Sequence, residues 1–274
     1  MTATTAASPA TASSEADAIR TEVDGPLLWV RLDRAAKRNA ITAAMYARLA
    51  QVFDEADRTP SVRTLVITGF NGTDHDVFSS GNDLADFLAN PPKDESSPTV
   101  EFLKALARFS KPLVAAASGP AVGIGMTLLL HCDLVYAGDN ARFQFPFTNL
   151  GVVPEAGSTQ LLPRSIGHVR ASELLMLGEP FTAEQALEWG LVNAVAPAAE
   201  VEQLARSRAL KLAAQPAAAL RATKALIRSG RNADLNSVIL TEMQVFAERL
   251  TSPEAQEAVS AFLQKRKPDF TQFD

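Results

Sequence analysis

The chain has few of the residues from which cross-linked or aromatic-rich folds are built. It contains one cysteine, Cys132, among 274 residues, so no intrachain disulfide can form and a hydrophobic core must hold the fold. Aromatic residues make up 7% of a chain that is 47% hydrophobic. We therefore expect a core of Ala, Val, Leu and Ile, the usual mixture where helices pack on a sheet, and the composition favours the α/β class.

Positive charge and long apolar runs are also scarce. The formal net charge is −5, so the basic excess that marks nucleic-acid-binding proteins is missing. The longest apolar run, residues 121–130, is too short to cross a bilayer and contains two glycines. Residues 1–19 are mostly Ala, Thr and Ser, lack the basic and apolar segments of a signal peptide, and predict a disordered tail. We expect a soluble, cytoplasmic protein that binds neither membranes nor nucleic acid.

Strands and helices alternate in the first part of the sequence. A helix with Thr42 as its N-cap is predicted over residues 42–57. Proline-bearing residues 90–98 predict a mobile loop, a candidate lid. Helices between successive strands favour parallel βαβ connections. Buried strands are predicted at residues 27–32, 64–68, 113–117 and 134–136.

Helical signals dominate the last third of the sequence. Thr182 and Gln185 have the spacing of a capping box. Pro216 and Pro253 suit the first turns of helices, and residues 217–227 have a helical composition. This part of the chain is therefore predicted to form a helical layer.

Two short segments carry glycines after predicted strands: FSSGNDL at residues 78–84 and GPAVGIG at residues 119–125. Glycine tolerates backbone conformations that leave an amide N–H exposed. In the second segment a helix is expected to begin near Ile124, where the first N–H groups lack intrahelical partners and lie at the positive end of the helix dipole. Such amides favour a developing negative charge, although tight turns before buried helices use the same residues.

Five segments, in this order and spacing, resemble the crotonase (enoyl-CoA hydratase/isomerase) superfamily over nearly all of residues 23–270. The resemblance implies an α/β fold with a repeated ββα core, here residues 20–200, followed by a C-terminal helical trimerisation region, here residues 201–274. It also implies homotrimers or hexamers and a role in fatty acid metabolism. The segments are DRAAKRNAI (33–41), FSSGNDL (78–84), GPAVGIGMTLLLHCD (119–133), NLGVVPEAGS (149–158) and AFLQKRKP (261–268).

The resemblance implies an acyl-CoA substrate, with coenzyme A as part of the substrate and no separate cofactor. The backbone N–H groups of Asn82 and Ile124 would form an oxyanion hole for the thioester carbonyl oxygen. A thioester suits this arrangement because its carbonyl accepts electron density when an adjacent proton is removed, and paired amides stabilise the resulting enolate. The identity of the two side chains would matter little.

The same resemblance implies contacts to coenzyme A. A cation suits its phosphates, yet exposed charges in a loop or at a helix end are equally ordinary solvated surface. The implied contacts are Lys37, Arg38, Ser80 and, across a subunit boundary, Lys265.

The positions implied to be catalytic depart from the hydratase pattern. In the hydratases that this chain resembles, two glutamates hold and activate a water molecule, and the matching positions here are Thr127 and Phe147. Neither can act as a carboxylate base, and both are expected to line the acyl pocket. Glu155 instead resembles the single catalytic glutamate of peroxisomal-type Δ3,Δ2-enoyl-CoA isomerases, and one base suffices for an allylic shift. Alternatively, Glu155 caps a helix that begins near Ala156.

The pattern thus predicts an enoyl-CoA isomerase, with two groups of alternatives. One is another enzyme of the same type, such as a hydratase that uses Glu155, a lyase, a thioester hydrolase or a dehalogenase. The other is a catalytically silent acyl-CoA-binding protein. No metal site is expected at the adjacent Asp74, His75 and Asp76, because neighbouring loop residues rarely share one ion. Core or surface roles are expected for the remaining histidines, His131 and His168.

Overall fold

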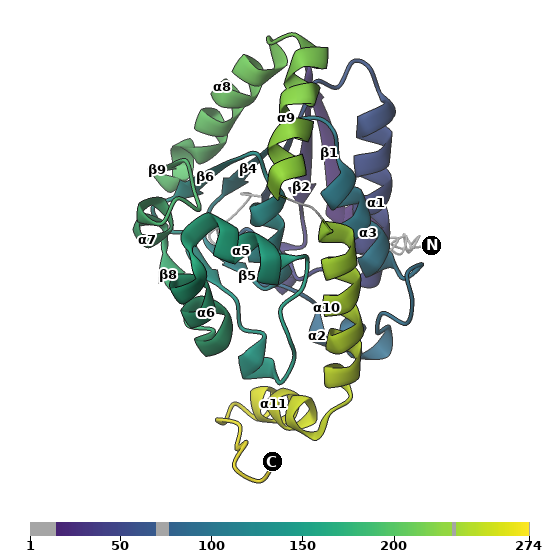
Figure 1. Cartoon of the computed structure of the whole chain (residues 1–274), viewed down its shortest axis with the longest axis vertical. Helices are drawn as coiled ribbons and strands as arrows, with labels where there is room; N and C mark the ends of the chain where they lie inside the picture. The colour runs from purple at the N-terminus through teal and green to yellow at the C-terminus, as the bar shows by residue number, and fades with distance from the viewer. Residues whose placement is uncertain (1–14, 70–76, 232–233, 274) are drawn as a thin grey trace, which may run out of the picture.

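A twisted, mostly parallel sheet lies at the centre of the molecule (Figure 1). The computed structural model describes residues 15–69, 77–231 and 234–273. In the six-stranded sheet the strands follow the order β1-β2-β3-β4-β6-β9, and neighbours pair in parallel except for the antiparallel β1 and β2. This confirms the α/β class. The strands are β1 (Ile19–Asp24), β2 (Leu27–Leu32), β3 (Thr64–Gly69), β4 (Leu113–Ala117), β6 (Leu134–Gly138) and β9 (Ala194–Ala196).

A second, three-stranded sheet consists of β5 (Pro120–Val122), β7 (Arg142–Gln144) and β8 (Phe181–Thr182), in that order. β5 pairs in parallel with β7, and β7 pairs antiparallel with β8. β5 leads directly into the short helix α4 (Ile124–Thr127). The small sheet therefore sets the direction in which the first residues of α4 point.

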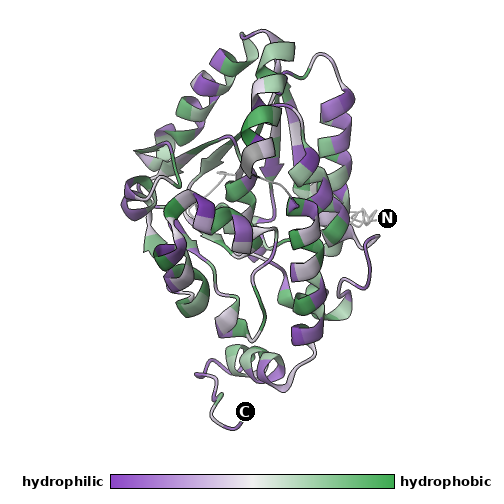
Figure 2. Cartoon of the chain, viewed as in Figure 1, coloured by the Kyte–Doolittle hydropathy of each residue, from purple (hydrophilic) through white to green (hydrophobic). Residues whose placement is uncertain are grey.

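Different helices cover the two faces of the large sheet. Side chains alternate along β2, so Leu28 and Val30 join the core on one face while Leu27 and Trp29 join the core on the other. The first face packs on α1 (Ala43–Arg58), α3 (Pro98–Arg108) and α4, and the second packs on α8 (Val201–Ala213). Figure 2 shows hydrophobic and hydrophilic residues alternating around these covering helices, as burial of one helix face requires.

The other helices surround this centre or extend from it as the C-terminal layer. In the part of the chain that the structure describes, no helix is both long and apolar enough to cross a bilayer. The remaining α-helices are α2 (Leu84–Ala89), α5 (Ser158–Ile166), α6 (His168–Leu177), α7 (Ala183–Glu188), α9 (Ala217–Arg231), α10 (Leu235–Leu250) and α11 (Pro253–Leu263). The 3-10 turns are η1 (Glu15–Ala18), η2 (Ala35–Lys37), η3 (Leu128–His131), η4 (Thr148–Leu150) and η5 (Ala198–Glu200).

Local signals in the sequence located several element boundaries. The Thr42 hydroxyl accepts the N–H of Met45 at 3.4 Å and caps α1, as predicted. Thr182 and Gln185 form the predicted capping box at the start of α7. Pro253 is the first residue of α11, as predicted, whereas Pro216 stands just before α9.

Two boundaries differ from the prediction. Residues 15–19 of the predicted tail are structured, because Glu15–Ala18 forms η1 and the buried Ile19 begins β1; residues 1–14 lie outside the described part of the chain. β1 was missed because four of its six residues are exposed, so it lacks the run of buried residues that marks β2, β3, β4 and β6 of this sheet. The predicted loop over residues 90–98 ends at residue 97, since Pro98 already begins α3.

Candidate active site

The two glycine-bearing segments lie side by side. The N–H of Ser79 donates to the carbonyl oxygen of Pro120 at 3.1 Å, and the N–H of Val122 donates to the carbonyl oxygen of Ser79 at 2.9 Å. These bonds form a parallel bridge between Ser79 and Ala121. Gly125 allows the close approach, because a Cβ at this position would lie 2.8 Å from the Ser79 carbonyl oxygen. A short ladder therefore fixes the first segment against the second.

Each segment presents one unpaired backbone amide. Ile41 and Asn82 form a parallel bridge: the N–H of Ile41 donates to the carbonyl oxygen of Gly81 at 2.8 Å, and the N–H of Asp83 donates to the carbonyl oxygen of Ile41 at 2.9 Å. Because successive residues of a strand point in opposite directions, the N–H of Asn82 points away from Ile41. The N–H of Ile124 is the first of α4 and has no intrahelical acceptor. Within the described ranges neither the Asn82 nor the Ile124 N–H has a protein acceptor, so both are free to bind a substrate oxygen.

Two glycine turns bring these amides close together. Gly81 has a φ of +95° and Gly123 a φ of +55°, conformations that strain any residue with a Cβ. A Cβ placed on Gly123 would be 3.9 Å from the Cα of Gly81, which shows how near the two turns are. The residues after these turns are Asn82 and Ile124, the predicted pair of amides.

Glu155 is buried beside the same short helix. Glu155 is 2% exposed, and its Oε1 accepts a hydrogen bond from the Thr127 hydroxyl at 2.9 Å. Burial raises the pKa of the Glu155 carboxyl to about 8; the Thr127 hydrogen bond lowers this pKa, and the nearby charge of Glu242 raises it. Thr127 is the last residue of α4, whose first residue is Ile124. One helical turn therefore links the carboxyl to an unpaired amide.

The alternative that Glu155 is a helix cap is wrong. α5 begins at Ser158 with Gly157 as its N-cap, and the Glu155 carboxyl bonds to Thr127 instead. The helix cannot begin near Ala156 because Ala156 and Gly157 have positive φ angles of 60° and 71°.

Three residues of this site were not identified as such from the sequence. Tyr46 of α1 is 1% exposed, and its hydroxyl donates to Oδ1 of Asn82 at 2.5 Å. Burial and the charge of Glu155 raise the Tyr46 pKa well above its usual value. The position of Tyr46 on the apolar face of a predicted helix, four residues after the Thr42 cap, was the only signal for it. The others are His131 and Glu242, which contact the segment after Glu155.

Three of the four predicted coenzyme A contacts lie together. The N–H of Ser80 donates to the carbonyl oxygen of Arg38 at 3.0 Å, and the Ser80 hydroxyl is 3.5 Å from the carbonyl oxygen of Lys37. The side chains of Lys37 and Arg38 are exposed, and Ser80 stands two positions before Asn82, whose amide is unpaired. Lys265 follows α11 and is exposed; in the described ranges no hydrogen bond or ion pair joins it to the other three.

The second predicted acyl-pocket residue, Phe147, is buried. Phe147 is 4% exposed and lies at the start of η4 in the main core. Asp74, His75 and Asp76 lie outside the described residues.

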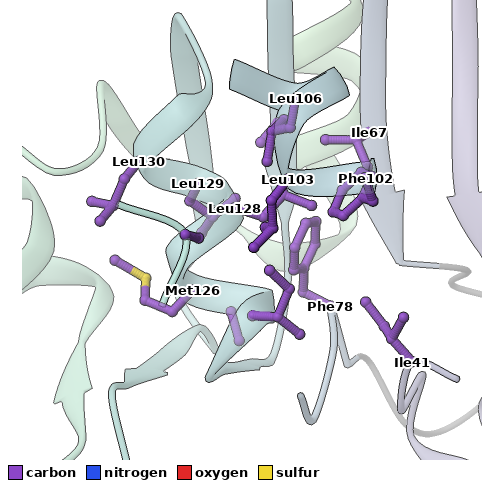
Figure 3. Packing of buried hydrophobic residues seen from close by; sticks show 14 of the residues in the cluster. Ile41, Ile67, Phe78, Phe102, Leu103, Leu106, Met126, Leu128, Leu129 and Leu130 are labelled. Atoms are coloured by element: carbon purple, nitrogen blue, oxygen red, sulfur yellow. The ribbon is translucent and has the colours of Figure 1, made fainter. Parts of the chain in front are cut away.

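The hydrophobic core anchors the whole arrangement. Figure 3 shows Phe78 of the first segment and Ile41 gathered with Leu103 of α3, Met126 of α4 and Leu128 of η3. The site therefore combines two backbone donors with one buried carboxyl group whose pKa is about 8. Such a set can stabilise an oxyanion and transfer a proton.

Comparisons with known proteins point to one family. The sequence pattern of the enoyl-CoA hydratase/isomerase family matches residues 22–273. A 2,3-dehydroadipyl-CoA hydratase of Escherichia coli K12 is 38% identical over 245 residues, which cover 89% of this chain and 94% of the relative. Enoyl-CoA delta isomerase 2 of Rattus norvegicus is 36% identical over 262 residues, 93% of this chain and 66% of the relative. The solved structure of Pseudomonas aeruginosa OdaA superposes with a TM-score of 0.86 at 48% identity, covering 90% of this chain and 99% of that one.

Proposed function

The chain belongs to the enoyl-CoA hydratase/isomerase family, and from this premise we propose that it is a Δ3,Δ2-enoyl-CoA isomerase. One observation carries the proposal: the buried Glu155 carboxyl is bonded to the same short helix whose first amide, that of Ile124, is unpaired. The resemblance assigns Thr127 and Phe147 to the two positions at which the hydratases have glutamates. A site with one base favours proton transfer over the activation of water.

The proposed reaction moves one proton and one double bond. The Glu155 carboxylate takes a proton from C2 of a 3-enoyl thioester. The electron pair shifts into the thioester carbonyl, and the N–H groups of Asn82 and Ile124 stabilise the dienolate oxygen. Glu155 then returns the proton at C4 while the double bond forms between C2 and C3. The product is a 2-enoyl thioester with the same atoms as the substrate.

The burial of Glu155 suits this role. A base works best when its pKa is near the working pH, and the Glu155 pKa is about 8. Only the carboxylate form accepts a proton, so activity is lost as the pH falls below about 8 and is fully present above it. At pH 7 roughly a tenth of the molecules carry the ionised base.

We also propose the contacts and assembly that this function needs. Lys37, Arg38 and Ser80 are neighbours, and we propose that they contact coenzyme A, which arrives as part of the substrate; Lys265 is proposed to act from a neighbouring subunit. A homotrimer or hexamer would also cover some of the large apolar side chains that are exposed in one chain. These include Val169, Met176, Leu226, Ile227 and Phe262. The single cysteine supports a cytoplasmic location.

Hydration is the second candidate, because a relative that is 38% identical bears the name of a hydratase. Incubating the protein separately with 3-hexenoyl-CoA and 2-hexenoyl-CoA, followed by chromatography and mass spectrometry, separates the two reactions. An isomerase interconverts the two compounds without a change of mass. A product heavier by one water molecule as the sole product would refute the isomerase proposal.

A further inference from the structure

Glu242 is a buried acid that reaches the candidate site from a distant part of the chain. It lies on α10, is 6% exposed, and contacts the segment that follows Glu155. Its Oε2 accepts the N–H of Gly157 at 2.5 Å. Its Oε1 accepts both the N–H of Thr159 at 3.0 Å and the Thr159 hydroxyl at 2.5 Å. Both carboxylate oxygens are therefore occupied by donors of this segment.

The segment that Glu242 holds needs support because its backbone is unusual. Ala156 and Gly157 are both in the left-handed conformation, which is unfavourable for alanine. Nε2 of His131 lies 2.7 Å from the carbonyl oxygen of Ala156 and holds it from another side. α10 also packs directly on the turn, since a Cβ on Gly157 would be 2.4 Å from Cδ1 of Leu235.

Glu242 also brings a second negative charge near Glu155. Burial raises the Glu242 pKa to about 7, while the hydrogen bonds from Thr159 and Gly157 lower it. The charge of Glu242 in turn raises the Glu155 pKa. The other polar groups near Glu155 are the Thr127 hydroxyl of α4, the Tyr46 hydroxyl of α1 and, through Ala156, the imidazole of His131.

We propose that Glu242 is a positioning residue: from α10 it holds Gly157 and Thr159 by hydrogen bonds, fixes the backbone that carries Glu155, and places a second carboxylate charge beside it. Glu242 does not itself transfer the proton, because both of its oxygens are bonded to Gly157 and Thr159. The inference rests on the proposed function only in treating Glu155 as the base.

The test compares Glu242→Gln with a matched control on the same helix, Glu248→Gln, whose side chain is exposed. Gln has nearly the same shape but no charge and one oxygen fewer. In Glu242→Gln we expect kcat to fall about tenfold or more, with KM changed less than about threefold, because the base is displaced while the substrate still binds. The midpoint of the acidic limb of the kcat profile should move to lower pH, because the repelling charge is gone.

A midpoint in Glu242→Gln that equals the midpoint in Glu248→Gln overturns the proposal, whatever happens to kcat. Loss of packing alone would lower kcat without changing the charge near Glu155. The two variants therefore separate a positioning residue from one that only supports the fold.

Infrared titration of the protonated carboxyl band gives a readout that needs no turnover. Above pH 6, carboxyl groups with ordinary pKa values are ionised, and among the described residues Glu155 and Glu242 are the carboxyls with raised pKa values that contribute to the remaining band. The repulsion acts on both groups, so Glu155→Gln should lower the Glu242 midpoint even if Glu242→Gln does not fold. An unmoved Glu242 midpoint overturns the proposal. A moved midpoint in a protein that does not isomerise 3-hexenoyl-CoA supports the role of Glu242 and refutes the proposed function alone.

Discussion

The two halves of the candidate site are held by different kinds of contact. The amide half, residues 79–82 and 121–124, is fixed by backbone hydrogen bonds of a short ladder between Ser79 and Ala121. The acid half, residues 155–159, is fixed by side chains from elsewhere: the hydroxyl of Thr127, the imidazole of His131 and the carboxylate of Glu242. The amide half therefore depends on what lies along the local backbone, and the acid half depends on distant side chains.

This difference predicts which substitutions each half of the site should tolerate. Backbone N–H donors persist when the side chain at their position is replaced, so the amide half should respond mainly to added bulk at its glycines. A buried carboxyl depends on its own identity and on each neighbouring donor and charge, so the acid half should respond to isosteric changes that leave the fold intact.

The largest effect is expected from Glu155→Gln in the acid half. Gln keeps the shape but cannot accept the C2 proton, so kcat for 3-hexenoyl-CoA should fall about 10²–10⁴-fold. Binding of acyl-CoA, measured by calorimetry, should change little. The control is Glu173→Gln, an exposed glutamate of α6, which should behave as wild type. Turnover of Glu155→Gln within about twofold of wild type would place the base elsewhere.

A larger side chain in the amide half should give the next largest loss of kcat. A Cβ at Gly125 would lie 2.8 Å from the carbonyl oxygen and 2.9 Å from the Cβ of Ser79, so Gly125→Ala must push α4 away from the first segment. Displacing the Ile124 donor should lower kcat about 10²-fold or more. The control is Gly25→Ala, in the turn between β1 and β2, where φ is +57° and an added Cβ meets nothing within 4 Å, so the change strains the backbone without touching α4. Full activity of Gly125→Ala would show that the Ile124 amide is not used.

Thr127→Val sharpens the comparison because Thr127 belongs to α4 but acts on the acid half. Removing the hydroxyl takes a hydrogen bond from the Glu155 carboxylate, so the Glu155 pKa should rise by about 1 unit. The base is active only when ionised, so the rate at pH 7 should fall about tenfold and recover at higher pH. A pH profile of kcat checks this, with the exposed Thr241→Val as control. A lower rate that does not recover at high pH would contradict the charge argument.

The smallest effect is expected from Asn82→Ala. The backbone N–H remains, and the variant loses only the side-chain hydrogen bond with Tyr46. We expect kcat/KM for 3-hexenoyl-CoA to fall by about threefold, the effect of one hydrogen bond at the edge of the site. A loss as large as that of Glu155→Gln would show that the Asn82 side chain takes part in the reaction, and the distinction between the halves would fail.

Much of the large sheet could be predicted from the sequence. β2 and β4 have the predicted bounds, and β3 and β6 begin at the predicted residues. The small sheet was not predicted, because β5 and β7 have three residues each and β8 has two. A strand this short shows no period of alternation that a sequence pattern could reveal. Yet β5 directs α4, so a feature without a sequence signal positions half of the site.

The sequence by itself determined the features that depend only on residues close together along the chain. Helix caps at Thr42 and Thr182, the buried strands and the glycine turns before Asn82 and Ile124 all follow from residues within a few positions of one another. The five family segments likewise single out Glu155 as the candidate base from the sequence alone.

Only the tertiary structure decided the state and support of Glu155. Its hydrogen bond to Thr127 spans 28 residues, and the bond from Gly157 to Glu242 spans 85. The same holds for Tyr46, which is 36 residues from Asn82. Burial and through-space charge set the Glu155 pKa of about 8, and neither is a property of a sequence window. The local pattern of the chain singles out Glu155 as the proposed base, and the folded molecule determines when its carboxyl carries a charge.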